Sequence, residues 1–169
     1  MWNFTGQQRP DFAEEPGPGQ ESVWDYPRPP VLVTCDSLVE VKLGGEVIAS
    51  TSAALRVLET ASPPTYYLPP DSVVMQALTK ASGTSFCEWK GQATYWAPLN
   101  APGNPIGWSY EGPVESFAQI DGYLSFYPGR VECYVDGERV RPQPGEFYGG
   151  WVTDTIVGPF KGEPGTGHW

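Results

Sequence analysis

Residues 39–48 read VEVKLGGEVI, and residues 131–140 read VECYVDGERV. Each stretch is rich in β-branched residues and centres on a pair that ends in glycine, Gly-Gly in the first and Asp-Gly in the second. Such pairs tolerate the positive φ angles of a tight β-hairpin turn. The two stretches also match at Val, Glu, Gly, Glu and the closing β-branched residue. We therefore predict two hairpins, at 38–49 and 131–140, in comparable positions of a fold built from two related halves.

The rest of the chain is also typical of short strands. Its 169 residues include 19 Pro and 20 Gly, which interrupt long helices, and 7 Trp, 9 Tyr and 7 Phe, which strands favour. Residues 52–59 fit either a strand or a single helical turn, and residues 73–78 fit a short helix capped by Asp71 or Ser72. We predict a single, mostly antiparallel β domain with a minor helical fraction. Further strand-like segments are 86–99, 106–110, 122–127 and 149–160.

Residues 1–27 differ from this pattern. They carry five acidic residues against one arginine, a net charge of −4, and show no apolar period. They also hold five aromatic residues, which soluble proteins usually cover. We expect an acidic arm that docks on its own domain or on a second copy of it, so both a monomer and a homodimer remain open. The aromatic residues are Trp2, Phe4, Phe12, Trp24 and Tyr26.

Charge and cysteine content narrow the class of protein. The whole chain has a formal charge of −10 and no cluster of Lys and Arg, and the absence of such a cluster argues against nucleic-acid binding. No apolar run approaches the roughly 18 residues that span a bilayer, and the N-terminus lacks a signal-peptide pattern. Cys35, Cys87 and Cys133 are an odd, widely spaced set and a poor disulfide framework. These features predict a cytoplasmic protein without a membrane partner.

Several separate motifs occur in a fixed order along the chain. They are RPP (28–30), LGGEVIAST (43–51), LRVLET (55–60), PPTYYLPPDSV (63–73), CEWKGQATYW (87–96), GWSYEGP (107–113) and GYLSFYPGRVECYVDGERV (122–140). This ordered series resembles a bacterial family, domain of unknown function 427. The resemblance implies a compact, two-sheet fold similar to β-tent proteins, with the family-like β domain at 28–141 and a C-terminal extension packed on it at 142–169.

The resemblance also marks polar residues and suggests how this chain departs from its relatives. Ser72 stands where members commonly have a second Asp, which weakens any role for a carboxylate pair there. Some β-tent relatives bind zinc through two Cys-x-x-Cys pairs, and this sequence has none. Three scattered cysteines do not supply the four donors of a structural zinc site, so we predict no metal and no cofactor. The residues that match the family's polar signature are Glu59, Tyr67, Asp71, Cys87, Lys90, Gly91 and Tyr95.

A nucleotidyltransferase-like label is sometimes attached to this family. That chemistry uses paired carboxylates to hold two divalent ions, often beside a glycine-rich phosphate cradle. The sequence has no Asp-x-Asp, no Gly-Ser pair and no P-loop. Asp136 and Glu138 come nearest to a carboxylate pair, but they flank a hairpin turn in which Asp-Gly is expected for conformational reasons. The residues therefore give the label no support.

Cys87, Lys90 and Glu59 are the candidates for chemistry. A thiol near an ammonium group can become a nucleophile, but on a strand Cys87 and Lys90 would point to opposite faces, so an inert, buried Cys87 is the alternative. Glu59 and Lys90 fit surface ion pairs; the sharper interpretation is that they pair with each other inside a pocket, because either charge is costly to bury alone. The walls of that pocket would be Tyr67, Tyr95, Trp108 and Tyr110.

Three functions remain open. The favoured one is a small-molecule binding domain, with anions among its ligands, that uses this Glu, Lys and aromatic pocket. The second is a metal-independent enzyme or a nucleotidyltransferase-like transferase, with Glu59, Cys87 or Lys90 as catalytic residue. The third is a protein-interaction module without a pocket, held through the aromatic arm.

Overall fold

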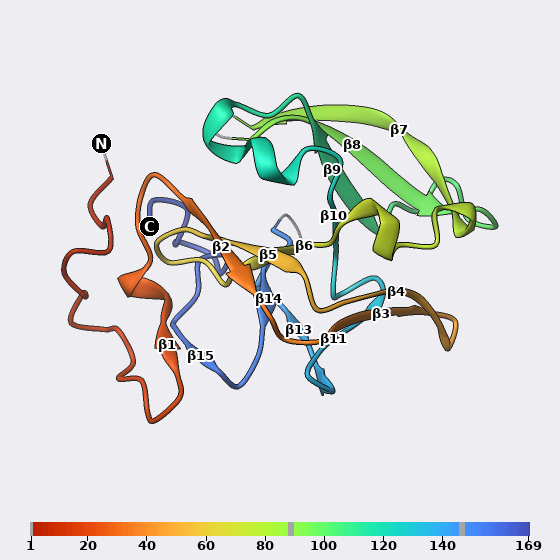
Figure 1. Cartoon of the computed structure of the whole chain (residues 1–169). Coiled ribbons are helices and arrows are strands. Elements are labelled where there is room, and N and C mark those ends of the chain that lie inside the picture. The colour runs from red at the N-terminus through yellow and green to blue at the C-terminus, as the bar shows by residue number, and fades with distance from the viewer. Residues whose placement is uncertain (1, 88–89, 146–147) are drawn as a thin grey trace.

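Strands dominate the computed structural model, which describes residues 2–87, 90–145 and 148–169 (Figure 1). The predicted mostly-β fold is confirmed, with several antiparallel sheets in one domain. The helices in the described ranges are short 3-10 turns, so the expected minor helical fraction is confirmed too. They are Val23–Asp25 (η1), Pro70–Ser72 (η2), Met75–Ala77 (η3) and Glu115–Ile120 (η4).

The two predicted hairpins lie side by side in one four-stranded sheet. The first joins β3 (Val39–Leu43) to β4 (Glu46–Thr51), and the second joins β11 (Glu132–Val135) to β12 (Glu138–Arg139). The order is β12-β11-β3-β4, with β11 antiparallel to β3. Both turn pairs have positive φ, as the Gly-Gly and Asp-Gly pairs predict.

The match between the hairpins extends to their pairing. Val41 of β3 lies opposite Cys133 of β11, and these two residues occupy equivalent places in the repeated pattern. Both are fully buried. Equivalent strands that pair antiparallel about equivalent residues are related by an approximate two-fold axis, which passes here between Val41 and Cys133.

Two further sheets flank the cavity described below. A second four-stranded sheet, in the order β10-β9-β8-β7, stands apart from the rest in Figure 1, and a three-stranded sheet has the order β2-β5-β6. Backbone hydrogen bonds between Leu68 and Leu124 link the two at 2.7 and 2.9 Å. The strands are β2 (Val31–Cys35), β5 (Ala54–Leu58), β6 (Thr65–Tyr67), β7 (Leu78–Cys87), β8 (Gly91–Pro98), β9 (Gly107–Glu111) and β10 (Leu124–Phe126).

The two ambiguous segments now have definite structures. Of residues 52–59, the part 54–58 is strand β5. The short helix expected at 73–78 is wrong in extent, because only the 3-10 turn η3 forms there before strand β7 begins. The reason is tertiary: the Val74 N–H donates to the Ile48 carbonyl at 2.7 Å, which ties this backbone to β4. Ser72 donates to the Pro69 carbonyl instead of capping a helix.

The N-terminal arm packs on the C-terminal segment of the same chain. Strand β1 (Glu21–Ser22) pairs in parallel with β15 (Ile156–Val157), and both ends of the chain lie on the same side in Figure 1. Trp24 is fully buried, and its Nε1–H donates to the Pro159 carbonyl at 3.1 Å. The N-terminal arm and the C-terminal segment therefore share one apolar cluster.

The two remaining short strands, β13 (Arg141–Pro142) and β14 (Trp151–Val152), pair with each other.

The contact between the arm and the domain includes an acid-sensitive carboxylate. Glu21 accepts hydrogen bonds from Arg56 at 3.0 Å and from the Tyr26 hydroxyl at 2.8 Å. The Arg56 hydrogen bond lowers the pKa of Glu21 below 4.5, against the opposing effect of burial, and Tyr26 lowers it further. The stabilisation is therefore present above pH 4.5 and is lost as the pH falls through the lowered folded value.

We expect Glu21→Gln to reduce stability at neutral pH and to make much less difference near pH 3. Urea unfolding at a series of pH values measures this directly. Glu46→Gln, at an exposed strand end, serves as the control. An equal effect of Glu21→Gln at both ends of the pH range would contradict the prediction.

No helix in the described ranges is long and apolar enough to cross a membrane.

Candidate functional site

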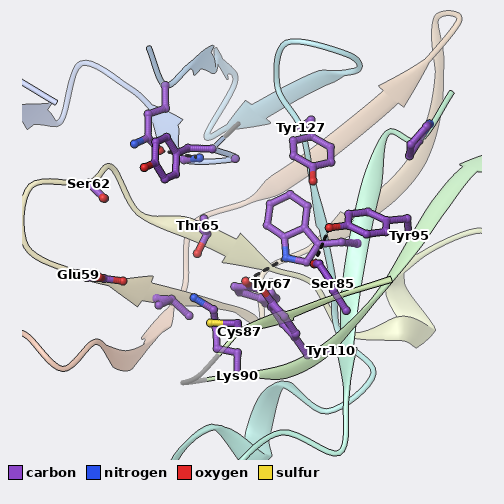
Figure 2. A pocket seen from close by; sticks show the side chains of 18 of the residues that line it. Glu59, Ser62, Thr65, Tyr67, Ser85, Cys87, Lys90, Tyr95, Tyr110 and Tyr127 are labelled. Atoms are coloured by element: carbon purple, nitrogen blue, oxygen red, sulfur yellow. Dashed lines mark hydrogen bonds between the residues drawn. The ribbon is translucent and has the colours of Figure 1, made fainter. Parts of the chain in front are cut away.

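A cavity of about 670 Å³ is walled by the β2-β5-β6 sheet, the β7–β10 sheet and the C-terminal segment (Figure 2). This volume lies within the range of small-molecule sites. All seven candidate residues from the sequence line this one cavity, although they come from four strands, a strand end and a turn. They are Glu59, Tyr67, Cys87, Lys90, Tyr95, Trp108 and Tyr110.

The other two residues of the family-like signature lie elsewhere or act on the backbone. Asp71 is exposed in η2 and is not part of the cavity wall. Gly91 begins β8 with a φ of +92°, and a Cβ there would lie 3.2 Å from Pro113. Gly91 is therefore explained by conformation and close backbone approach.

The cavity has an aromatic floor, which consists of Tyr67, Tyr95, Trp108 and Tyr110. Trp108 and Tyr110 project from the same face of β9 because they are two residues apart on a strand. The Trp108 Nε1–H donates to the hydroxyl of the buried Tyr67 at 3.3 Å, and their rings meet edge to face. The hydroxyls of Ser85 and Tyr95 lie 2.6 Å apart. Hydroxyl groups are thus held at fixed points on an otherwise apolar surface.

The C-terminal segment closes another side of the cavity. A Cβ on Gly149 would overlap the Trp108 indole, and one on Gly150 would overlap the Gln143 amide oxygen. Gly149 lets this backbone lie flat against the Trp108 ring, and Gly150 leaves room for Gln143 and Pro63. The sequence singled out neither residue, although a Gly-Gly pair beside an apolar run is a visible signal.

Lys90 and Cys87 lie next to each other, which corrects the expectation that they face opposite ways (Figure 2). The expectation assumed one continuous strand, but β7 ends at Cys87 and β8 begins at Gly91. Lys90 lies in the turn between them, so strand alternation does not apply to it. Its ammonium group is 5.8 Å from the centroid of the Tyr110 ring. Glu88 and Trp89, which separate Cys87 from Lys90 in the sequence, lie outside the described residues.

The surroundings of Lys90 favour its charged form. Burial opposes the charge, but interactions with Tyr67, Cys87 and Glu59 outweigh it and raise the pKa of Lys90 above its ordinary value of 10.5. The ammonium group is therefore fully protonated at neutral pH. The group is better suited to binding an anion than to acting as a base or as an amine nucleophile.

Glu59 makes its ion pair with Arg28 rather than with Lys90. Glu59 Oε2 lies 3.4 Å from Arg28 Nε, and the Arg28 side chain is only 2% exposed. The ion pairs among described residues do not include Lys90, so the predicted Glu59–Lys90 pair is wrong as a direct contact. Arg28 lies next to Glu59 because of the register between β2 and β5. Val31 pairs with Leu58, so the residues just before β2 lie beside the end of β5.

Lys161 is a second lysine of the cavity wall, and no motif in the sequence marked it. It is buried, and its Nζ lies 3.3 Å from the Trp169 carbonyl oxygen. Burial and the nearby Arg28 lower the pKa of Lys161, while Glu59 acts in the opposite direction. Its signal in the sequence was weak, since it is only one of four lysines in the chain.

Glu59 therefore acts on three cations at one end of the cavity. It contacts Arg28 and influences Lys90 and Lys161 at longer range. Among the described residues that line the cavity, Glu59 is the one acidic side chain, whereas Lys90, Lys161 and Arg130 are basic. The described wall thus carries an excess of positive charge in a chain whose formal charge is −10.

Within the described ranges, no group of three or more His, Cys, Asp and Glu side chains is placed to hold a metal ion.

Arg130 of the cavity wall is held by two contacts. Its guanidinium carbon lies 4.3 Å from the centroid of the Tyr127 ring, and its Nη1 donates to the Pro105 carbonyl at 2.8 Å.

Comparison with known proteins places the chain in a family. A search of the curated proteins found no match. A family model described as "Domain of unknown function (DUF427)" matches residues 31–137, which is more than half of the chain. The matched span contains Glu59, Cys87, Lys90 and the aromatic floor, and it ends before Lys161. The chain belongs to this family, DUF427.

Proposed function

We propose that this protein is a small-molecule binding domain whose cavity takes an anionic ligand with a flat, aromatic or apolar body. The observation that carries the proposal is the charge at the Glu59 end of the cavity. There, one described carboxylate serves Arg28, Lys90 and Lys161.

The charged residues support an anionic ligand, because a cation that is shielded from water is costly unless an anion pairs with it. Glu59 is held by Arg28, so Lys90 has no carboxylate of a described residue in direct contact. An anionic group next to Lys90 would supply that partner and would accept charge-assisted hydrogen bonds. The net charge of the whole chain is strongly negative, so this basic wall is a local feature.

The remaining walls support a flat ligand body. Trp108 and Tyr110 present ring surfaces, and the hydroxyl groups of Tyr95 and Ser85 are fixed by their mutual contact. A ligand ring gains from stacking or edge contacts with such side chains, beyond the apolar area it buries. Aromatic walls combined with polar groups at fixed positions are typical of small-molecule sites.

Thermal-shift measurements with charge-matched pairs of compounds test the proposal. Benzoate is compared with benzamide, indole-3-acetate with indole-3-acetamide, and a nucleoside monophosphate with its nucleoside. A ligand that binds only the folded state raises the unfolding temperature. We expect the anion of each pair that binds to give the larger shift. Shifts that are absent for every anion, or equal within every pair, would contradict the proposal.

Lys90→Met should weaken binding of any such anion by about tenfold or more, which corresponds to about 1.4 kcal/mol of binding free energy. The substitution removes the charge but keeps an unbranched side chain of similar length. Lys42→Met on β3, outside the cavity wall, is the matched control and should leave affinity unchanged. Calorimetric titration measures both. An unchanged affinity in Lys90→Met would remove Lys90 from the site.

A further inference from the structure

The three cysteines of the chain have different surroundings. Cys133 is fully buried at the centre of a sheet, and burial raises the pKa of its thiol. Cys35 ends β2 beside Asp36, away from the cavity, and is half-buried. Cys87 is half-buried at the end of β7, on the wall of the cavity. Cys87 is thus the cysteine that a molecule inside the cavity can reach.

A second feature of the same wall bears on the thiol. Lys90 lies beside Cys87, and the thiol is one of the groups that keep the Lys90 ammonium charged. The same ammonium would attract an anion into the cavity and hold it next to the sulfur. The place of Cys87 on the cavity wall and the charge of Lys90 therefore favour the same reaction, which is attack of the sulfur on an anionic electrophile.

We propose that Cys87 is a nucleophilic site of this cavity, which captures small anionic electrophiles that Lys90 draws to it. The preference for anions rests on the proposed function, whereas the reactivity of the sulfur is a separate property. Cys87 and Lys90 would act together, Lys90 as the electrostatic anchor and Cys87 as the group that forms the bond.

Iodoacetate is a suitable probe, because it is a small anionic electrophile with a neutral counterpart of similar size, iodoacetamide. In the reaction a sulfur electron pair of the thiolate forms a bond to the methylene carbon. The carbon–iodine bond breaks, and iodide leaves with its electron pair. The thiol proton passes to solvent, and no oxidant or reductant is needed.

The experiment measures alkylation rates of each cysteine in the native protein by mass spectrometry of its peptides. The ratio of the iodoacetate rate to the iodoacetamide rate is compared between Cys87 and Cys35 in the same sample. At Cys35 the chain's overall negative charge should disfavour iodoacetate. At Cys87 we expect this ratio to be at least about tenfold higher, because the Lys90 charge acts at close range.

Substitutions at Lys90 test the cause. Lys90→Met should lower the Cys87 ratio to the value at Cys35, whereas Lys90→Arg should retain most of the preference, because it retains the charge. Lys42→Met is the matched control and should behave as the wild type. Equal ratios at Cys87 and Cys35 in the wild-type protein would overturn the proposal without any variant. A preference that survives in Lys90→Met would overturn the role of Lys90.

Failure of this inference is distinguishable from failure of the proposed function. Unreactive anions such as benzoate report binding alone, because they cannot alkylate the thiol. If they stabilise the wild-type protein while Cys87 shows no preference for iodoacetate, the cavity binds anions and only the nucleophilic role is wrong. If no anion stabilises the wild-type protein, the proposed function is wrong.

Discussion

Replacing Trp24 with alanine is expected to lower the free energy of unfolding by about 3–5 kcal/mol, the cost of removing a large aromatic side chain from a core. Trp24 is fully buried between the N-terminal arm and the C-terminal segment. Its ring meets Phe4 and Trp169 edge to face, with centroid distances of 5.2 Å in both cases. Urea unfolding followed by circular dichroism measures the change.

Phe12→Ala is the matched control from the same aromatic cluster. Phe12 stacks on Trp169 at 5.1 Å but is 48% exposed, so it loses much less apolar burial. We expect an effect of about 1 kcal/mol or less. A small effect of Trp24→Ala, similar to that of Phe12→Ala, would show that the arm is not part of the cooperative fold.

Arg28→Met is expected to lower the free energy of unfolding by about 3 kcal/mol. The guanidinium group pairs with Glu59 and donates to the carbonyls of Phe4, Thr60 and Trp169 at 2.9–3.0 Å. Methionine keeps most of the apolar contact but leaves the carboxylate and three carbonyls without this donor. Arg139→Met, whose side chain is 54% exposed, should change stability by a few tenths of a kcal/mol.

The Arg28 substitution also has a consequence for the cavity, which Arg28 does not itself line. Without Arg28, the Glu59 carboxylate is free to turn towards Lys90 and compete with an anionic ligand. We therefore expect Arg28→Met to weaken anion binding, and the double variant Arg28→Met with Glu59→Gln to recover both affinity and part of the stability. Equal anion affinity in Arg28→Met and wild type would show that Glu59 does not compete for Lys90.

Local sequence pattern was sufficient wherever local physics decides the conformation. The Gly-Gly and Asp-Gly pairs at 44–45 and 136–137 determine tight turns, because few other residue pairs accept positive φ at both positions. The β-branched residues around them determine strands. The candidate residues also came from the sequence, through motifs in a family-like order, and the structure brings all seven to one cavity.

Pairing across the chain was beyond the sequence, because it depends on which strands meet. The β2–β5 register places Glu59 beside Arg28 rather than beside Lys90. Strand β7 ends at Cys87, so Lys90 lies in the following turn, where its side chain lies next to the thiol. Lys161 reaches the wall from a segment about 100 residues after Glu59 in the sequence. The sequence alone thus determined a strand-rich fold and a set of reactive residue types. Only the tertiary structure decided which charges neutralise one another, since Coulomb energy depends on distance in space and not on separation along the chain.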